Sequence, residues 1–140
     1  MGARRKAREF ALQMLYQHDI AGNPLETIVE NFEDLQKAKP PIREFAIEVF
    51  RGTVENLTQI DEMIVQQADN WRLSRMAVVD RNIIRMSIYE LMHETKTPKL
   101  VVIDEAIEIA KKFGTEKSSQ VINGILDGIL KRYNLSESEP

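Results

Sequence analysis

The sequence has 140 residues, a formal net charge of −3 and no cysteine. This length suits one domain that buries a core unaided. The lack of cysteine excludes a disulfide framework, a thiolate metal site and a cysteine nucleophile. The longest uncharged run falls far short of the ~20 residues of a transmembrane helix. Glu9 and Gln13 interrupt the apolar start, so it is not a signal peptide. We expect a soluble cytoplasmic protein.

The pattern of apolar residues predicts an all-α protein of about seven helices, because apolar residues recur at helical spacing almost everywhere. The first helix covers roughly residues 3–20. Asn23 and Pro24 are expected to start the second as N-cap and first-turn residue. The prolines of "KAKPP" separate it from a third helix that begins near Ile42. A break around residues 52–56 bends this helix or divides it from a fourth.

The second half of the chain is predicted to hold the buried centre. Ser74 is a plausible N-cap for a helix that is apolar on nearly every side, as is typical of a buried helix. The next helix, "KLVVIDEAIEIAKKFG", should end at Gly114. A last helix follows, and residues 136–140 read as a frayed tail. We therefore expect one domain over residues 1–135, built around the buried central helix.

Positive charge is concentrated at the start of the first helix. Residues 1–16 carry four bases against one acid, whereas residues 26–62 carry nine acids against four bases. Basic residues at a helix start oppose the helix dipole, and an unfavourable arrangement is a mild hint of function. A cationic patch on an acidic body favours selective binding of an anion.

A helical wheel predicts that the first helix carries two different faces. Arg5, Arg8, Leu12 and Tyr16 follow at spacings of three, four and four, and Lys6 flanks the core stripe. Cations beside an aromatic ring suit single-stranded RNA, whose phosphates and unstacked bases they would contact. The alternative is a solvated basic face with Leu12 and Tyr16 packed on other helices. The core stripe comprises Ala7, Phe10, Ala11 and Met14.

A second candidate anion site is the stretch "KKFGTEKSSQVINGILDGIL". It combines lysines with hydroxyl groups at the start of a helix, where free amides also point outward. The alternative is an ordinary capped turn. Asn123 is expected to reach a base, a phosphate or a neighbouring backbone, and Gly124 to permit a close helix crossing or a local irregularity. The lysines are Lys111, Lys112 and Lys117, and the hydroxyls belong to Thr115, Ser118 and Ser119.

The central helix carries polar groups that need partners. Asp80, Ser87 and Glu90 lie close together on its wheel. One interpretation is internal pairing with Arg81, Arg85 or a lysine from another helix, since buried carboxylates need partners. The other is an acidic patch that is open to a basic protein.

Three segments resemble the NusB family of bacterial transcription antitermination factors: "RRKAREFALQMLYQ", "DRNIIRMSIYEL" and "IDEAIEIAKKFGTEKSSQVINGILD". They occur in the family's order and spacing, and the likeness runs from about Ala3 to Arg132. It implies two small helical bundles packed together. It also implies a protein that binds the boxA element of nascent ribosomal RNA with NusE, a small-subunit ribosomal protein. The complex would join NusA and NusG on RNA polymerase and suppress termination.

The resemblance and the patterns together give two sets of candidate site residues. Family members often have Phe where this chain has Val121, and valine cannot stack on a base, so Tyr16 is expected to carry more of the stacking. The partner-binding candidates are Asp80, Ile84 and Ser87, of which Asp80 matches the family's NusE-facing acid. The RNA-binding candidates are Arg4, Arg5, Lys6, Arg8, Tyr16, Lys112, Lys117, Ser118, Ser119 and Asn123.

An enzyme is the less favoured function class, and we expect no catalytic residue, metal or cofactor. The acid pairs Asp61-Glu62 and Asp104-Glu105 are helix neighbours that point about 100° apart. His18 and His93 lack companions at ligand spacing, and there is no P-loop. The family's fold also occurs as the leading domain of certain ribosomal RNA methyltransferases, but the sequence ends where a catalytic domain would begin, so we expect this chain to lack that chemistry. The remaining alternative is a helical module that binds only protein.

Overall fold

The computed structural model describes residues 2–68, 73–94, 96–133 and 135. Over these residues it contains helices and connecting turns without any strand, which confirms the predicted all-α class. The predicted tail, residues 136–140, lies outside the described residues. The helices are α1 (Gly2–Ala21), α2 (Leu25–Asn31), α3 (Glu33–Lys37), α4 (Pro40–Glu55), α5 (Leu57–Gln67), the short 3₁₀ helix η1 (Leu73–Arg75), α6 (Val78–His93), α7 (Lys99–Phe113) and α8 (Ser118–Arg132).

Helix boundaries differ from the prediction in the first half of the chain. Pro40 begins α4 instead of preceding it, because a first-turn residue needs no backbone N–H donor. The predicted second helix is divided at Phe32, which has an extended backbone. The Phe32 ring packs edge-on against the Phe10 ring, with 5.3 Å between the ring centres. Asn23 is not an N-cap, since α2 begins at Leu25 without a side-chain cap.

The predicted break near residues 52–56 is confirmed, because Asn56 separates α4 from α5. Ser74 is not the N-cap of the central helix. It lies within η1, and α6 begins only at Val78.

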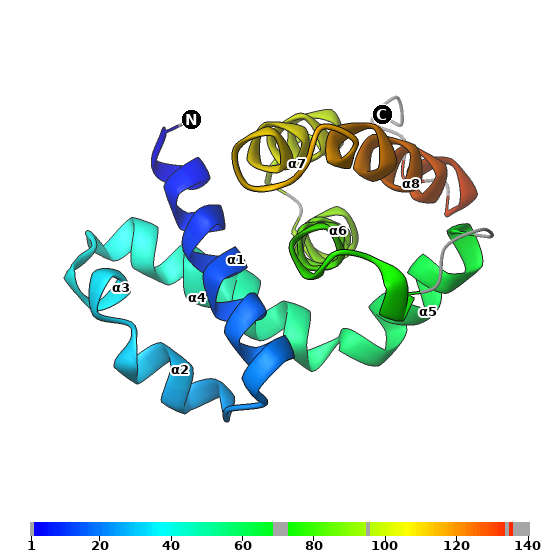
Figure 1. Ribbon diagram of the computed structural model, residues 1–140. Coiled ribbons are helices and arrows are strands. Elements are labelled where there is room, and N and C mark those ends of the chain that lie inside the picture. Colours follow the sequence, from blue (N-terminus) through cyan, green and yellow to red (C-terminus); the bar gives the residue numbers. More distant parts are fainter. Residues whose placement is uncertain (1, 69–72, 95, 134, 136–140) are drawn as a thin grey trace.

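Helix α6 is the centre of the molecule. It contacts α1, α4, α5, α7 and α8, and Figure 1 shows it nearly end-on with these helices around it. Ile83, Ile84 and Ile88 have no solvent exposure, as expected for a helix that is apolar on most sides. Helices α1 to α4 form one group and α5 to α8 the other, with α1 packed between α4 and α6 (Figure 1).

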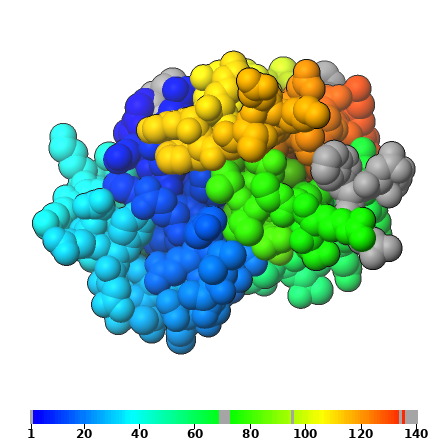
Figure 2. Space-filling view, viewed as in Figure 1, coloured from blue at the N-terminus to red at the C-terminus, as the bar shows by residue number. Residues whose placement is uncertain are grey.

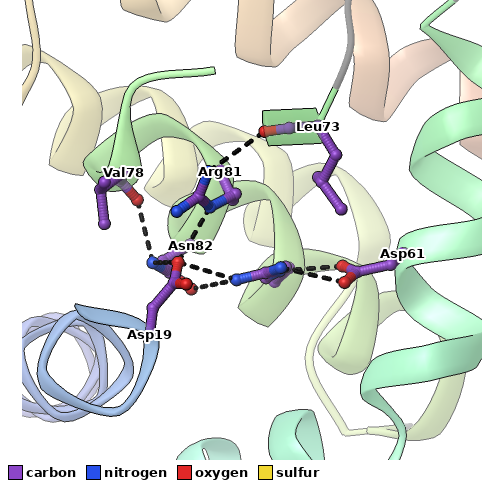
Figure 3. A network of polar contacts seen from close by, with 7 residues as sticks. Asp19, Asp61, Leu73, Val78, Arg81 and Asn82 are labelled. Carbon is purple, nitrogen blue, oxygen red and sulfur yellow. Dashed lines mark hydrogen bonds and ion pairs between the residues drawn. The ribbon is translucent and has the colours of Figure 1, made fainter. Parts of the chain in front are cut away.

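A polar network fixes the end of α1 against α6 and α5 (Figure 3). Asp19 accepts hydrogen bonds from Arg81 Nε (2.8 Å), Asn82 Nδ2 (3.0 Å) and Arg85 Nη1 (3.0 Å). Arg85 also donates through Nε and Nη2 to Asp61 at 2.8 and 2.9 Å. Burial acts to raise the pKa of Asp19, but these donors outweigh it and hold that pKa below its usual value. The network thus joins the end of α1 to α6 and, through Arg85, to α5.

Candidate nucleic-acid interface

Arg8 is sealed inside the protein, contrary to the predicted outward orientation. Its Nε and Nη2 each donate a 2.8 Å hydrogen bond to the Glu90 carboxylate, and the two side chains are 3% and 1% exposed. Leu12 is buried as well. The prediction failed at these residues because α6 and α7 cover a second side of α1 beside its core stripe. A phosphate cannot reach the Arg8 guanidinium in this structure.

Arg5 lies at the surface but is not free. Its Nε and Nη2 each donate a 2.8 Å hydrogen bond to Glu105 on α7. The Arg5 side chain is 40% exposed, whereas that of Glu105 is 3% exposed. This contact lowers the pKa of the Glu105 carboxyl and raises that of the guanidinium, so both stay charged. Arg5 therefore remains available to an anion from one side only.

Arg4 and Lys6 complete the exposed start of α1. The Arg4 guanidinium lies 4.0 Å from the centre of the Phe45 ring, and its Nη1 donates to Thr97 Oγ1 at 3.2 Å. Lys6 is exposed, with Nζ 5.0 Å from the centre of the Phe10 ring. The charged groups of both side chains thus lie against aromatic rings, and both residues remain exposed to solvent.

Lys112, at the end of α7, joins these cations. Its Nζ lies 3.1 Å from both carboxylate oxygens of Glu9. Arg4, Arg5, Lys6 and Lys112 therefore form what we call the cationic edge. Figure 2 shows the surface where α1 (dark blue) meets α7 and the following turn (yellow).

Nearly buried carboxylates lie beneath the cationic edge. Glu105 underlies Arg5, Glu9 underlies Lys112, and Glu94 lies 3.9 Å from Arg4 Nη1. All three acids are buried. The edge is thus a layer of positive groups over a layer of negative ones.

The turn before α8 contributes less to the surface than predicted. Ser118 is buried, and its Oγ accepts a 2.8 Å hydrogen bond from the Thr115 backbone N–H. The hydroxyl stabilises the turn, so the prediction that Ser118 meets RNA is wrong. Gly114 permits this contact, because a Cβ there would lie 2.5 Å from Ser118 Oγ. Lys117 is exposed and Ser119 half-buried, and both remain candidates.

Asn123 and Gly124 lie exposed on α8. A Cβ on Gly124 would meet no atom within 4 Å, so the predicted close helix crossing is wrong. A glycine in a helix interior costs about 1 kcal/mol relative to alanine. No packing within the described chain offsets that cost, so the position is left open to a close approach from outside. Val121 is half-buried against the core.

Tyr16 and Phe113 flank an apolar pocket of about 230 Å³, which Leu12, Gln13 and Val79 complete. The two rings are 45% and 39% exposed. The sequence alone does not indicate this pocket, because its walls come from three segments that are far apart in the chain. Tyr16 lies eleven residues after Arg5, or about 16 Å along the helix axis.

The predicted partner-binding residues differ in their exposure to solvent. Ile84 and Ser87 are buried, so the prediction that they form a surface is wrong. Glu90 pairs with Arg8, while Arg81 and Arg85 pair with Asp19 and Asp61, so these described residues of α6 form no continuous acidic patch.

Asp80 alone of the three partner-binding candidates is half-buried instead of buried. Its Oδ1 is buried without a hydrogen-bond partner among the described residues. It follows Val79 of the apolar pocket in the chain.

Sequence reasoning missed the turn between α6 and α7. Glu94 accepts hydrogen bonds from the backbone N–H groups of Lys96 (2.6 Å) and Thr97 (2.8 Å). Burial acts to raise the pKa of Glu94, but these bonds and the nearby Arg4 lower it overall. The turn thereby sits beside the start of α1 and adds the exposed Lys96 to that surface.

The described part of the chain contains neither a candidate metal site nor a candidate membrane-spanning helix. It contains no group of three or more side chains arranged to hold a metal ion. His18 and His93 instead pack against the rings of Phe50 and Tyr89. None of its helices is both long enough and apolar enough to span a bilayer.

Fold and site together define an all-helical binding protein with a basic face. The NusB family model matches residues 5–131. A transcription antitermination protein NusB from Trichlorobacter lovleyi is 48% identical over 127 residues, 91% of this chain and 89% of its own. The chain belongs to the NusB family.

Solved structures agree with the family assignment. T. maritima NusB superposes with a TM-score of 0.85 at 43% identity, over 91% of this chain and 90% of that one. NusB solved with NusE in complex with double-stranded RNA gives a TM-score of 0.84 at 28% identity, over 95% and 99%.

Proposed function

We propose that this chain is an RNA-binding transcription antitermination factor. In this proposal it binds boxA of nascent ribosomal RNA together with NusE and joins NusA, NusG and RNA polymerase. Its relatives carry the antitermination name, and one structural neighbour was solved with NusE and RNA. The observation that carries the RNA-binding part is the cationic edge, with cations from α1 and α7 turned to solvent.

The cationic edge suits a flexible polyanion. Phosphates would lie along Arg4, Arg5 and Lys6 and continue toward Lys112, with Lys117 and Asn123 extending the path along the turn and α8. Arginine offers forked donors to phosphate. Contacts of this kind supply affinity and position the strand, but base contacts must supply the sequence preference.

The pocket between Tyr16 and Phe113 has two candidate ligands. Exposed rings can stack an unpaired base, which is the role predicted for Tyr16. A second candidate is a side chain of NusE, and the apolar lining of the pocket favours it. Measuring RNA alone and NusE alone against a Tyr16→Ala variant separates the two.

The decisive experiment titrates boxA-like and scrambled RNA of equal length, each with and without NusE. We expect boxA RNA to bind more tightly than scrambled RNA, and NusE to strengthen the difference. The Arg5→Glu/Lys6→Glu variant should lose RNA binding while remaining helical. Lys37→Glu is the matched control, because Lys37 is an exposed cation on α3, outside the cationic edge. Equal binding of both RNAs under all conditions would contradict a boxA preference, and no binding of either RNA would favour the protein-only module instead.

A further inference from the structure

We propose that Glu105 is a positioning residue for RNA binding, and that it acts by holding the guanidinium of Arg5. The proposal rests on the proposed function, because it names a residue beneath the RNA-binding surface that the phosphate never touches. The Glu105 side chain is 3% exposed, while the guanidinium above it is 40% exposed. RNA would therefore meet the arginine and not the acid.

The hydrogen-bond geometry leaves the outer edge of Arg5 free. A guanidinium has five N–H donors, one on Nε and two on each Nη. Glu105 takes the Nε donor and one Nη2 donor. The two donors on Nη1 and the second on Nη2 remain, and these form the end-on fork that matches two phosphate oxygens. The Glu105 carboxylate thus binds the side of the Arg5 guanidinium and leaves the end of the guanidinium facing solvent.

Arg8, on the second turn of α1, also helps to hold Glu105 in place. The Nη1 atom of Arg8 lies 3.9 Å from Glu105 Oε1, and Arg8 is itself fixed by its two bonds to Glu90. The carboxylate therefore cannot swing away with Arg5 toward the ligand. A long, otherwise mobile side chain is held in one place before RNA arrives, which reduces the entropy lost on binding.

Electrostatics alone predicts the opposite effect, and this difference makes the proposal testable. Replacing Glu105 by Gln removes a negative charge from beneath the RNA, so simple attraction would increase affinity. Positioning predicts a decrease of about three- to tenfold, the usual cost of immobilising one side chain. We therefore expect the Glu105→Gln variant to bind RNA more weakly although the protein becomes more positive.

Glu108→Gln is the matched control. Glu108 is an exposed residue of the same helix, and it pairs with Lys111 three residues further along that helix. It removes the same charge without touching Arg5, so we expect unchanged or slightly tighter RNA binding. A double-mutant cycle then tests the route of the effect. In an Arg5→Ala background, Glu105→Gln should no longer weaken binding.

Arg5→Lys provides an independent arm that does not depend on changing a buried acid. Lysine keeps the charge but lacks both forks. We expect it to lose nearly as much RNA affinity as Arg5→Ala. Three results would overturn the proposal. They are an Arg5→Lys variant that binds RNA as tightly as the parent, a Glu105→Gln variant that does so, and a Glu105→Gln defect that persists in the Arg5→Ala background. Failure of the proposed function looks different, because the parent protein itself would then ignore RNA and Arg5→Ala would change nothing.

Discussion

The carboxylate of Glu90 and the guanidinium of Arg8 form a two-pronged ion pair between α6 and α1 with almost no solvent contact. The two residues stand 82 positions apart in the sequence. This pair places the second turn of α1 against the central helix. An arginine that the helical wheel assigned to RNA therefore belongs to the interior, and its loss should affect folding first.

Arg8→Ala should destabilise the protein by about 3–5 kcal/mol, because the Glu90 carboxylate would be left buried without its partner. Urea unfolding followed by circular dichroism measures this. Lys37→Ala breaks an exposed pair with Glu33 and should cost at most a few tenths of a kcal/mol. If Arg8→Ala were as stable as Lys37→Ala, the buried pair would not contribute as described.

RNA affinity should depend on salt to the extent set by the cationic edge. Neutralising three to four phosphates predicts a slope of log affinity against log salt of about −2 to −3 for a single strand. Lys6→Ala should reduce the magnitude of the slope by about 0.7, because one phosphate contact is lost. Titrations at four salt concentrations check this, and a flat response in the parent would exclude phosphate contacts.

Gly124→Ala should move stability and RNA affinity in opposite directions. The added methyl group has open space around it and favours the helix, so stability should rise by about 0.5–1 kcal/mol. The same methyl should weaken RNA binding if the strand approaches the backbone there. Thermal unfolding and RNA titration of one protein preparation give both quantities. Increased stability with unchanged RNA affinity would place the strand elsewhere.

Tyr16→Ala should leave the fold intact, because nearly half of the ring is already exposed. If the ring stacks on a base, RNA affinity should fall by about 1–3 kcal/mol. If the pocket binds NusE, then NusE affinity should fall while RNA affinity without NusE stays constant. Calorimetric titration with each ligand separately decides between the two, and no change with either ligand would leave Tyr16 outside both interfaces.

Stability should fall on acidification as the carboxylates with lowered pKa take up protons. Asp19, Glu94 and Glu105 all titrate below their usual values of 3.8, 4.5 and 4.5. Between the folded and unfolded pKa values the unfolded chain binds more protons, so unfolding free energy rises with pH there. The contribution is complete above about pH 5 and is lost as pH falls below 4. Asp19→Asn should flatten this dependence in urea unfolding at pH 3 to 7.

The helical class and the buried central helix were predictable because they depend on local spacing. Ile83, Ile84 and Ile88 lie on several sides of one helix, and only a surrounded helix buries them all. The helix divided at Phe32 was not predictable, since the packing of that ring against Phe10 overrides the apolar pattern.

The candidate site was predictable in residue type but not in orientation. A wheel assigns a side chain to a face without saying how many faces are covered, and α1 is covered on more than one. Arg8 and Ser118 show the consequence: each is polar and placed in a basic stretch, yet each bonds a group inside the protein. Gly124 shows the reverse, because only the structure reveals that nothing within the described chain requires a glycine there.

The carboxylates under the cationic edge also shape its field at a distance. Arg4, Arg5 and Lys112 each form an outward-pointing dipole with the acid beneath them, and the field of a dipole decays faster than that of a bare charge. A polyanion within a Debye length is therefore attracted more weakly than it would be by bare charges, whereas one in contact meets the full set of donors. Association should then show little electrostatic steering, and most of the discrimination among RNA strands should reside in how slowly each one leaves.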